Sequence, residues 1–408
     1  MNQQYDAPVT IQGISLLELT EQYGTPLYVY DASKIKSQFE LLTSAFSTVS
    51  LKVKYACKAL TNIAVMRMMR EWGCGVDTVS IEEVMIAMRA GYSPSEICYT
   101  PNCVDFSEIE HAVELGVRIN IDDLSMLEKF GHRYGNTVPC CVRFNPHILA
   151  GGNPHIQVGH IDSKFGISVY QLRHLLRIVE NHSLNIVGVH MHTGSDILDP
   201  ATFLRGAEIL FETARSFPNL EFIDFGSGFK VPYKEGDYST NMMEFGAVMS
   251  EAFRNFCNEY GRELEIWFEP GKFLVSEAGY FLVKTNVIKQ TVSTLFAGVN
   301  SGQNHLIRPM FYDAYHHITN ISNPDGTPRV YSVVGYICET DTFGWDRKIA
   351  EIREDDILCM HNAGAYGFSM SSNYNSRLRP AEVLIHNGEA SLIRRRETLE
   401  DILRTQEL

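Results

Sequence analysis

Four polar segments of this sequence could together bind and use a phosphorylated aldehyde. Lys58 offers an amine nucleophile, His192 a flat ring that can stack on another ring, and Glu269 a carboxylate. Gly226-Ser227-Gly228 can wrap an anion with its backbone N–H groups. Each segment follows a short apolar run that predicts a β-strand. On a (β/α)8 barrel the carboxyl ends of the strands meet on one face, where such barrels carry out chemistry.

Lys58 follows the alternating run 53–57, so we expect it near the end of a strand. A lysine that leaves a strand is most often a solvated surface residue, and its position alone does not exclude that alternative. The functional interpretation is a Schiff-base lysine, because burial or a neighbouring cation lowers the pKa of an amine and makes it nucleophilic.

The glycine loop 226–228 follows the seventh expected strand, and Glu269-Pro270-Gly271-Lys272 follows the eighth. Barrels often bind phosphate after these two strands. A lone Gly-x-Gly is weak support for an anion site, but its agreement with the strand count strengthens it. Glu269 could be a helix cap or a salt-bridge partner. The alternative is a carboxylate that faces a pyridine nitrogen and keeps the ring protonated, so that the ring can accept electrons.

The sixth expected strand ends in two histidines, His190 and His192, on the same side of the strand. A His-x-His pattern suggests a metal site, but no third ligand of suitable spacing stands out in the sequence. A histidine that stacks on a flat cofactor ring fits the following Gly194-Ser195 better. We therefore expect no metal here.

Alternating elements must position these residues. From about Ser33 to Phe273, short β-like runs alternate with longer helical patterns, which is typical of parallel βα units. The helical stretches 63–72 and 82–90 are closed by Gly73 and Gly91 as candidate caps. We expect eight strands, with cores at 53–55, 76–79, 97–99, 117–121, 140–144, 186–190, 222–225 and 264–268. The sequence thus predicts an α/β fold with a TIM-like (β/α)8 barrel at 33–276.

After about Ser276 the pattern changes to β-rich runs bounded by turn residues, which predicts an all-β domain, a barrel or a sandwich. The expected runs are 280–287, 330–335, 357–361, 381–385 and 391–393. The segment 323–326, Asn-Pro-Asp-Gly, predicts a turn between two of its strands. The strand-like run 27–30 is expected to pair with this domain, which would then contain residues 1–32 and 277–408.

Composition excludes several classes of partner. The formal net charge of −14 disfavours nucleic acid and anionic membrane. The basic run Arg394-Arg395-Arg396 precedes Glu397, so we interpret it as a solvated edge. Residues 1–10 lack the pattern of a signal sequence, and no apolar stretch approaches the ~20 residues of a membrane span. Nine cysteines without a Cys-x-x-Cys pair are expected to be mostly reduced and buried. These features predict a cytoplasmic protein.

With these segments and several others, the sequence resembles the fold-type III PLP-dependent decarboxylases, and most closely the members that act on diaminopimelate. The resemblance extends from residue 24 to residue 384, which is nearly the whole chain. It is carried by motifs in a fixed order: Tyr55-Ala56-Cys57-Lys58, Asp77 with Ser80 and Glu83, Ser163-Lys164-Phe165-Gly166, His192-Thr193-Gly194-Ser195, Glu269-Pro270-Gly271, Arg308-Pro309-Met310-Phe311-Tyr312, Cys338-Glu339 and 363–379.

The resemblance implies a role for each matching residue. Lys58 would hold pyridoxal 5′-phosphate (PLP) as a Schiff base, His192 would stack on its ring, and Glu269 would face the pyridine nitrogen. Cys338 would protonate the carbanion that remains after carbon dioxide leaves. In a homodimer, Cys338 and Glu339 would reach the cofactor from the other subunit. The other implied cofactor contacts, mainly to phosphate, are Asp77, Ser195, Ser227, Gly228, Gly271 and Tyr366. The implied substrate contacts are Lys272, Arg308, Tyr312, Glu339 and Tyr366.

The charges of Arg308 and Glu339 indicate the substrate. Diaminopimelate carries a second carboxylate and a second ammonium group, which a guanidinium and an acid would bind. An ornithine or arginine decarboxylase would leave Arg308 unpaired. The expected reaction is therefore decarboxylation of meso-2,6-diaminopimelate to L-lysine and carbon dioxide, the last step of lysine biosynthesis. The alternative is a related diamine precursor, such as carboxynorspermidine, or a basic amino acid.

The sequence departs from the family pattern at three places. Lys272 stands where the family usually has arginine, which removes a bidentate contact to carboxylate or phosphate. The acidic loop reads Cys338-Glu339-Thr340-Asp341-Thr342 in place of Cys-Glu-Ser-Gly-Asp, and Ser227 lies at the centre of the phosphate glycines. The first two departures make the substrate less secure than the reaction type.

Two other classes share this barrel. A catalytically inactive relative that binds a protein partner would typically lose the lysine or the cysteine, and this chain keeps Lys58 and Cys338. An amino-acid racemase usually has an arginine at the pyridine nitrogen, where this chain has Glu269. Both alternatives are disfavoured.

Overall fold

The computed structural model describes residues 9–148 and 162–407; residues 1–8, part of the opening segment in which we expect no signal sequence, lie outside the described residues. The chain forms two compact units. The sheet unit contains the described parts of Met1–Ser37, Val231–Asp237 and Leu274–Leu408, and the barrel unit those of Gln38–Lys230 and Tyr238–Phe273. Among the described residues, no helix is both long and apolar enough to cross a membrane.

Eight parallel strands close the barrel. Each strand pairs with the next, β8 pairs with β10, and β12 pairs with β4. A short strand, β9 (Ile167–Ser168), adds to β8. The prediction of a (β/α)8 barrel is confirmed. Its strands are β4 (Leu51–Ala56), β5 (Gly75–Thr78), β6 (Ile97–Tyr99), β7 (Arg118–Ile121), β8 (Cys140–Asn145), β10 (Ile186–Met191), β11 (Phe222–Asp224) and β12 (Glu265–Phe268).

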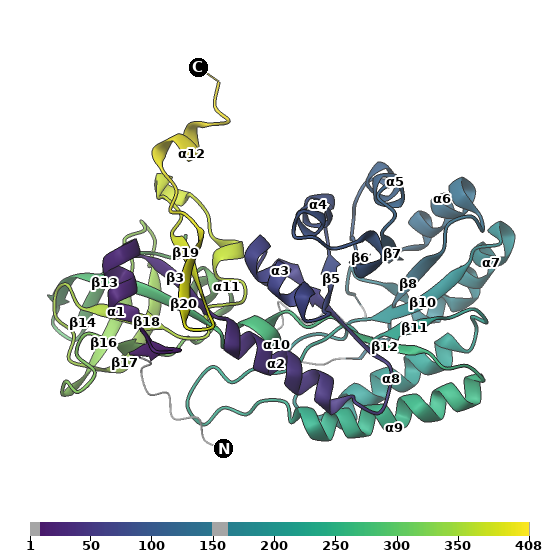
Figure 1. Cartoon of the computed structure of the whole chain (residues 1–408), viewed down its shortest axis with the longest axis horizontal. Coiled ribbons are helices and arrows are strands. Elements are labelled where there is room, and N and C mark those ends of the chain that lie inside the picture. The colour runs from purple at the N-terminus through teal and green to yellow at the C-terminus, as the bar shows by residue number, and fades with distance from the viewer. Residues whose placement is uncertain (1–8, 149–161, 408) are drawn as a thin grey trace. The chain divides into compact units, whose positions relative to one another are not determined.

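Helices cover the outside of these strands (Figure 1). Gly73 and Gly91 follow the ends of α3 and α4 at positive φ, as expected for glycines that close helices. The chain crosses from one unit to the other within helices α2 and α10. The helices are α2 (Ala32–Ala45), α3 (Ile63–Glu71), α4 (Ile81–Arg89), α5 (Phe106–Glu114), α6 (Leu124–Tyr134), α7 (Leu172–His182), α8 (Pro200–Ala214), α9 (Met242–Tyr260) and α10 (Lys272–Val275).

An aromatic pair fills part of the barrel interior. Phe222 and Trp267 stack with their ring centroids 3.6 Å apart, and the guanidinium of Arg118 lies 4.9 Å from the Phe222 ring. Gly188 makes room for this pair, because a Cβ there would lie 2.2 Å from the Phe222 ring. Side chains alternate between the two faces of a strand, so residues two positions further along β11 and β12, Asp224 and Glu269, point into the same interior. The stack therefore lies one layer below the polar residues of the site.

The sheet unit is built on β13 (Gly279–Gln290). β3 (Leu27–Asp31) pairs antiparallel with β13 and parallel with β19 (Ala381–His386), so the prediction that the opening strand joins this domain is confirmed. The turn at 323–326 is confirmed by a hydrogen bond from the N–H of Gly326 to the carbonyl of Asn323. The remaining elements are β1 (Thr10–Ile11), β2 (Ile14–Ser15), α1 (Leu16–Tyr23), β14 (Leu295–Val299), α11 (Arg308–Tyr312), β15 (Ile318–Asn320), β16 (Pro328–Val334), β17 (Thr342–Ala350), β18 (Ile357–Met360), β20 (Glu389–Arg394) and α12 (Leu399–Leu403).

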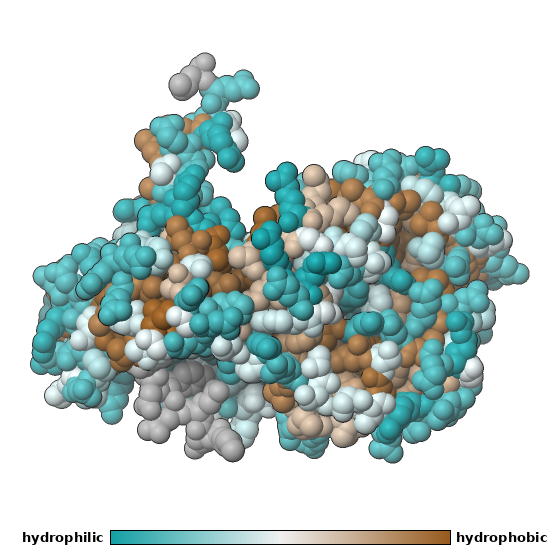
Figure 2. Space-filling model, in the orientation of Figure 1, coloured by the Kyte–Doolittle hydropathy of each residue, from teal (hydrophilic) through white to brown (hydrophobic). Residues whose placement is uncertain are grey.

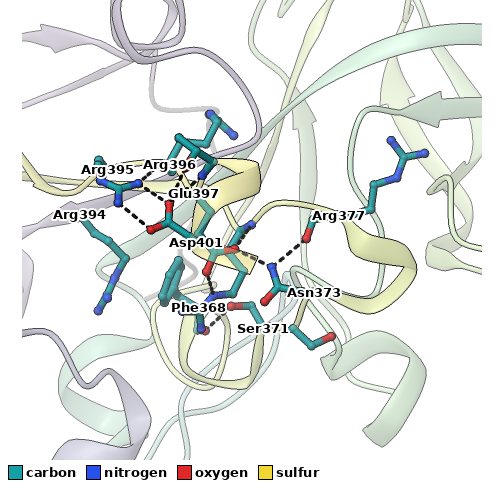
Figure 3. A network of polar contacts seen from close by, with 12 residues as sticks. Phe368, Ser371, Asn373, Arg377, Arg394, Arg395, Arg396, Glu397 and Asp401 are labelled. Carbon is teal, nitrogen blue, oxygen red and sulfur yellow. Dashed lines mark hydrogen bonds and ion pairs between the residues drawn. The ribbon is translucent and has the colours of Figure 1, made fainter. Parts of the chain in front are cut away.

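The arginine run 394–396, which begins at the last residue of β20 and is labelled in Figure 3, is a solvated edge only in part: Arg395 is exposed as expected, whereas Arg394 and Arg396 are half-buried. Arg394 donates to the fully buried carboxylate of Glu382, and Arg396 donates to the carbonyl of Pro26 at 2.7 Å. Arg395 forms two hydrogen bonds with Asp401, at 2.6 and 2.7 Å. The three side chains thus connect β20 to residues before and after it.

Hydrophilic residues cover much of the face shown in Figure 2.

We expect Glu382→Gln to destabilise the protein by about 2 kcal/mol, because it removes the charge that pairs with Arg394. Glu382 also accepts a hydrogen bond from the Tyr30 hydroxyl at 2.7 Å. The effect falls short of that for a fully buried pair, since the Arg394 side chain is 37% exposed. The shift of the urea unfolding midpoint measures it. Glu389→Gln, exposed on β20, is the control and should change stability by less than about 0.5 kcal/mol. Equal midpoints for the two variants would contradict the prediction.

Candidate active site

Lys58 lies just past the end of β4, in the single helical turn Cys57–Ala59. Its Nζ is 3.2 Å from Oδ2 of Asp77 at the end of β5, and the side chains are 41% and 1% exposed, respectively. Burial and the charge of Glu269 raise the pKa of Asp77 to about 7, although Lys58 acts against this shift. The lysine thus lies at the carboxyl end of the strands, as predicted, beside an acid that titrates near neutral pH.

Glu269 follows β12 and is buried with His190 and Asp224. His190 Nε2 donates to Glu269 Oε2 at 3.0 Å. Burial opposes ionisation of Glu269, but this hydrogen bond and the charge of Lys58 outweigh it and hold the pKa of Glu269 below its usual range. Burial and the charge of Glu269 raise the pKa of Asp224 well above its usual range. Of these two carboxyl groups, Glu269 is therefore the one that favours the ionised form, and Asp224 is the one that favours the protonated form.

In the sequence, no third ligand of suitable spacing stands out beside His190 and His192, and the expectation of no metal stays a prediction. One ligand atom each of His190, Asp224 and Glu269 lies within 4.8 Å of the others, whereas His192 is not part of this group. Within the group, Glu269 hydrogen-bonds with both His190 and Asp224.

His192 and the glycine loop contact each other. The backbone N–H of Ser227 donates to His192 Nδ1 at 3.2 Å. A Cβ at Gly226 would lie 2.7 Å from the same nitrogen, so a glycine is needed at this position. Burial, together with the charges of Arg143 and Lys58, lowers the pKa of His192 to about 3. The ring is therefore neutral at neutral pH, a state suited to stacking on a flat ring.

The second glycine of the loop also packs against backbone. Gly228 has φ +126°, and a Cβ there would lie 2.3 Å from the carbonyl oxygen of Gly194. The N–H of Ile197 donates to the carbonyl of Gly228 at 2.8 Å, so segment 194–197 runs alongside the loop. Gly271 lies near the turn of Lys58, since its Cβ would be 3.1 Å from that of Ala59. These glycines expose backbone where a phosphate is expected.

Ser195 and Lys272 meet beside this loop. Lys272 Nζ donates to Ser195 Oγ at 2.7 Å and to Asp196 Oδ1 at 2.5 Å. The lysine that replaces the family's arginine thus has a carboxylate partner of its own. Its predicted contact with substrate stays a prediction.

In the sheet unit, Arg308 begins helix α11 and Tyr312 ends it. The guanidinium carbon of Arg308 lies 5.2 Å from the ring centroid of Tyr233 and 5.9 Å from that of Tyr312. No carboxylate in the part of the chain that the structure describes forms an ion pair with Arg308. A guanidinium held between aromatic rings keeps its charge available for an acidic ligand.

Cys338 and Glu339 occupy an exposed loop of the sheet unit between β16 and β17. Asn375 donates to the Cys338 sulfur at 3.2 Å, and the Tyr374 hydroxyl donates to Glu339 Oε1 at 2.5 Å. The hydrogen bond from Tyr374 lowers the pKa of Glu339. All nine cysteines are free, and seven of them are buried, whereas Cys338 is exposed. An exposed thiol on a positioned loop is compatible with the predicted proton donor.

Asp341, which stands where the family pattern has glycine, holds the acidic loop 338–342 in place. Asp341 is buried, and its carboxylate accepts from the N–H of Ile337 at 2.8 Å and from that of Gln303 at 2.6 Å. A Cβ at Gly335 would lie 2.1 Å from Asp341 Oδ2, so the glycine gives this carboxylate its space. Asp341 therefore fixes the shape of the loop that presents Cys338.

Sequence reasoning missed several residues of these sites. Arg143 is buried on β8, its guanidinium carbon lies 4.7 Å from the Phe165 ring, and burial lowers its pKa. It is the one charged residue in the run Cys140–Asn145, a signal that could have identified it. Asp224 is likewise the one charged residue of β11. Tyr366 was predicted, and it is half-buried with φ +56° in the loop after β18.

Comparisons with known proteins agree with this geometry. A family model described as "Pyridoxal-dependent decarboxylase, pyridoxal binding domain" matches residues 32–276, which include the lysine, the glycine loop and the buried carboxylate. The diaminopimelate decarboxylase of Methanothermobacter thermautotrophicus is 40% identical over 406 residues, covering 97% of this chain and 95% of the relative. That of Aquifex aeolicus is 34% identical over 409 residues, covering 98% and 95%.

A solved structure is similar over the same range. The diaminopimelate decarboxylase from Helicobacter pylori complexed with L-lysine superposes with a TM-score of 0.87 at 30% identity, covering 95% of this chain and 98% of that chain. The chain therefore belongs to the diaminopimelate decarboxylase family of pyridoxal-dependent decarboxylases, and the resemblance seen in the sequence is confirmed.

The barrel residues fit PLP. The hydrogen bond from His190 uses Glu269 Oε2 and leaves the buried Oε1 of this ionised group as an anionic acceptor, which suits a protonated ring nitrogen. Lys58 lies close enough to Glu269 to lower its pKa. The glycines at 226 and 228 expose backbone beside Ser195. A ring nitrogen, an aldehyde and a phosphate thus each have a matching group in the barrel.

We expect the stability cost of Asp77 to grow with pH. The folded pKa of about 7 lies above the ordinary ~3.9 of an aspartate. Below about pH 4 the group is protonated in both states and costs no stability. As pH rises from about 4 to about 7 the unfolded chain ionises first, so the destabilisation grows. Asp77→Asn, which stays neutral, should therefore gain thermal stability relative to the unmodified apoprotein between pH 5 and about pH 7, and the gain should level off above. Asp325→Asn, at an exposed position, is the control. A difference in thermal stability between the two proteins that stays constant across this pH range would contradict the prediction.

Proposed function

We propose that this protein is a PLP-dependent enzyme that converts meso-2,6-diaminopimelate to L-lysine and carbon dioxide, the last step of lysine biosynthesis. Family membership supplies the reaction. The substrate assignment rests on the surroundings of Arg308. Its guanidinium forms no ion pair with any described carboxylate and lies 5.2 Å from the ring of Tyr233 and 5.9 Å from that of Tyr312. A second carboxylate on the substrate is the ligand that such a group binds best.

The barrel residues would hold the cofactor. Lys58 would attach it through its amine, His192 would stack on its ring, and Asp77 would contact it near Lys58. When bound, PLP supplies an electron sink for the charge left by carbon dioxide. Glu269, ionised and buried, would hold the proton at the ring nitrogen. The phosphate would be bound by Ser195, Ser227, Gly228, Gly271 and Tyr366.

The sheet-unit residues would bind the substrate and return a proton. Arg308 and Tyr312 would bind the distal carboxylate, and Glu339 the distal ammonium, with Tyr366 as a further contact and Lys272 contributing from the barrel unit. Cys338 would donate the proton that completes the product. Its loop is held by Asp341, so the thiol has a defined position.

We also propose a cytoplasmic homodimer with shared active sites. Cys338 and Glu339 would reach the cofactor bound by the partner subunit. Their exposure in the single chain supports this arrangement, because a second subunit can approach both residues.

The substrate assignment is tested by carbon dioxide release from the purified protein with added PLP. We expect release from meso-diaminopimelate, with lysine formed, and none from ornithine, arginine, lysine or carboxynorspermidine. Lys58→Ala is the control and should lose both turnover and borohydride-trapped cofactor. Release from carboxynorspermidine or ornithine instead would refute the roles of Arg308 and Glu339 and leave the barrel assignments standing.

The shared site is tested with mixed dimers. Lys58→Ala and Cys338→Ala should each be inactive alone. After mixing and exchange in equal amounts, half of the dimers are mixed, and each mixed dimer has one intact site of two, so roughly a quarter of the activity should return. No recovery, with mixed dimers confirmed by affinity tags, would place both residues of a site in one subunit.

A further inference from the structure

A buried histidine orients Arg308. Arg308 Nε lies 3.3 Å from Nε2 of His316, which is 1% exposed. On the other side of the ring, Nδ1 lies 2.9 Å from the carbonyl oxygen of His361. A carbonyl can only accept a hydrogen bond, so Nδ1 carries the proton. Burial, together with the charge of Arg308, lowers the pKa of His316 to about 3, so the ring is neutral and its Nε2 accepts from Arg308.

The sheet anchors this contact. The N–H of His361 donates to the carbonyl of His317 at 2.9 Å, next to the pairing of β15 with β18. The Tyr233 ring packs edge-on against His316, with centroids 5.6 Å apart, and also faces Arg308. The imidazole therefore has a position set by backbone hydrogen bonds and by an aromatic neighbour, all within the sheet unit.

The contact decides which edge of the guanidinium is used. Of its five N–H donors, the one on Nε is directed to His316, and the rings of Tyr233 and Tyr312 lie beside the group. The two terminal nitrogens are the edge that binds a carboxylate in a bidentate way. A neutral acceptor at Nε fixes the direction of this edge without neutralising the charge, as an acidic partner would.

We propose that His316 is a positioning residue that directs the terminal nitrogens of Arg308, and so selects ligands with a carboxylate remote from the reacting carbon. The inference rests on the proposed function, since it assumes that Arg308 binds that carboxylate. Among the described residues, no acidic side chain is paired with Arg308, so the hydrogen bond to His316 is not in competition with an ion pair.

The test uses two ligands that differ by one carboxylate, lysine and cadaverine. Their dissociation constants are measured by calorimetry on the PLP-loaded protein. His316→Phe keeps the ring volume and removes the acceptor, and it should weaken lysine about 10- to 100-fold while cadaverine stays within twofold. His316→Gln, whose amide oxygen can accept from Arg308, should restore most of the preference. His317→Phe, at the half-buried neighbouring position, is the matched control and should keep the preference for lysine.

Four outcomes separate the possibilities. If Arg308→Met and His316→Phe both remove the preference for lysine, and the double variant adds nothing, the inference holds. If Arg308→Met removes it and His316→Phe does not, the positioning role is refuted and the proposed function stands. If Arg308→Met leaves the preference intact, the role of Arg308 in the proposed function is itself refuted. Equal loss of both ligands in His316→Phe would indicate a merely structural role and would also overturn the inference.

Discussion

The barrel site depends on keeping one buried carboxylate ionised. Removing the charge of Glu269 from water is costly, and the interactions with His190, Lys58 and Asp224 offset that cost. The neighbouring acids behave differently, since burial first and the charge of Glu269 second raise the pKa of both Asp77 and Asp224. The ionised Glu269 therefore adds to the effect of burial in favouring the protonated form of the acids around it.

Two charged residues of the sheet unit, Arg308 and Glu339, are held in the opposite way. Arg308 is held by a neutral imidazole and by aromatic rings, and Glu339 by the hydroxyl of Tyr374 and the amide of Gln303. None of these partners carries a compensating charge. In the barrel, charges interact strongly with one another and tune proton affinity, whereas here they are oriented and stay available. The first arrangement suits chemistry on a cofactor, and the second suits recognition of a charged substrate.

The sequence predicted the repeating architecture well because its signal is local. All eight barrel strands are apolar runs followed by helical patterns, and each expected core overlaps an observed strand. Strand β17 was missed because Thr342–Ala350 contains Gly344 and the polar run Asp346-Arg347-Lys348, which an exposed strand tolerates. Strands β14 and β15 are short and were missed as well. The opening strand was placed correctly because Leu27–Tyr30 is fully buried and apolar.

The site was predictable only where a residue type is unusual at its position. Lysine, histidine and glycine at strand ends stood out, whereas Asp224 and Arg143 looked like single polar residues in strands. Their importance comes from the distance to Glu269, which no spacing in the sequence reveals. His316 was missed for the same reason, since its partners are Arg308 and the backbone of His361.

Two of the three departures from the family pattern, Lys272 and Asp341, form their own polar contacts. Lys272 meets Asp196 and Ser195, so its charge is paired beside the glycine loop. The carboxylate of Asp341 accepts hydrogen bonds from the backbone of Ile337 and Gln303, and Gly335 gives it space. Because each of these charges is bonded to groups of its own unit, neither adds a free charge that would compete with Arg308 or Glu339. The charges proposed for the distal end of the substrate therefore stay those of an arginine and a glutamate, one of each sign.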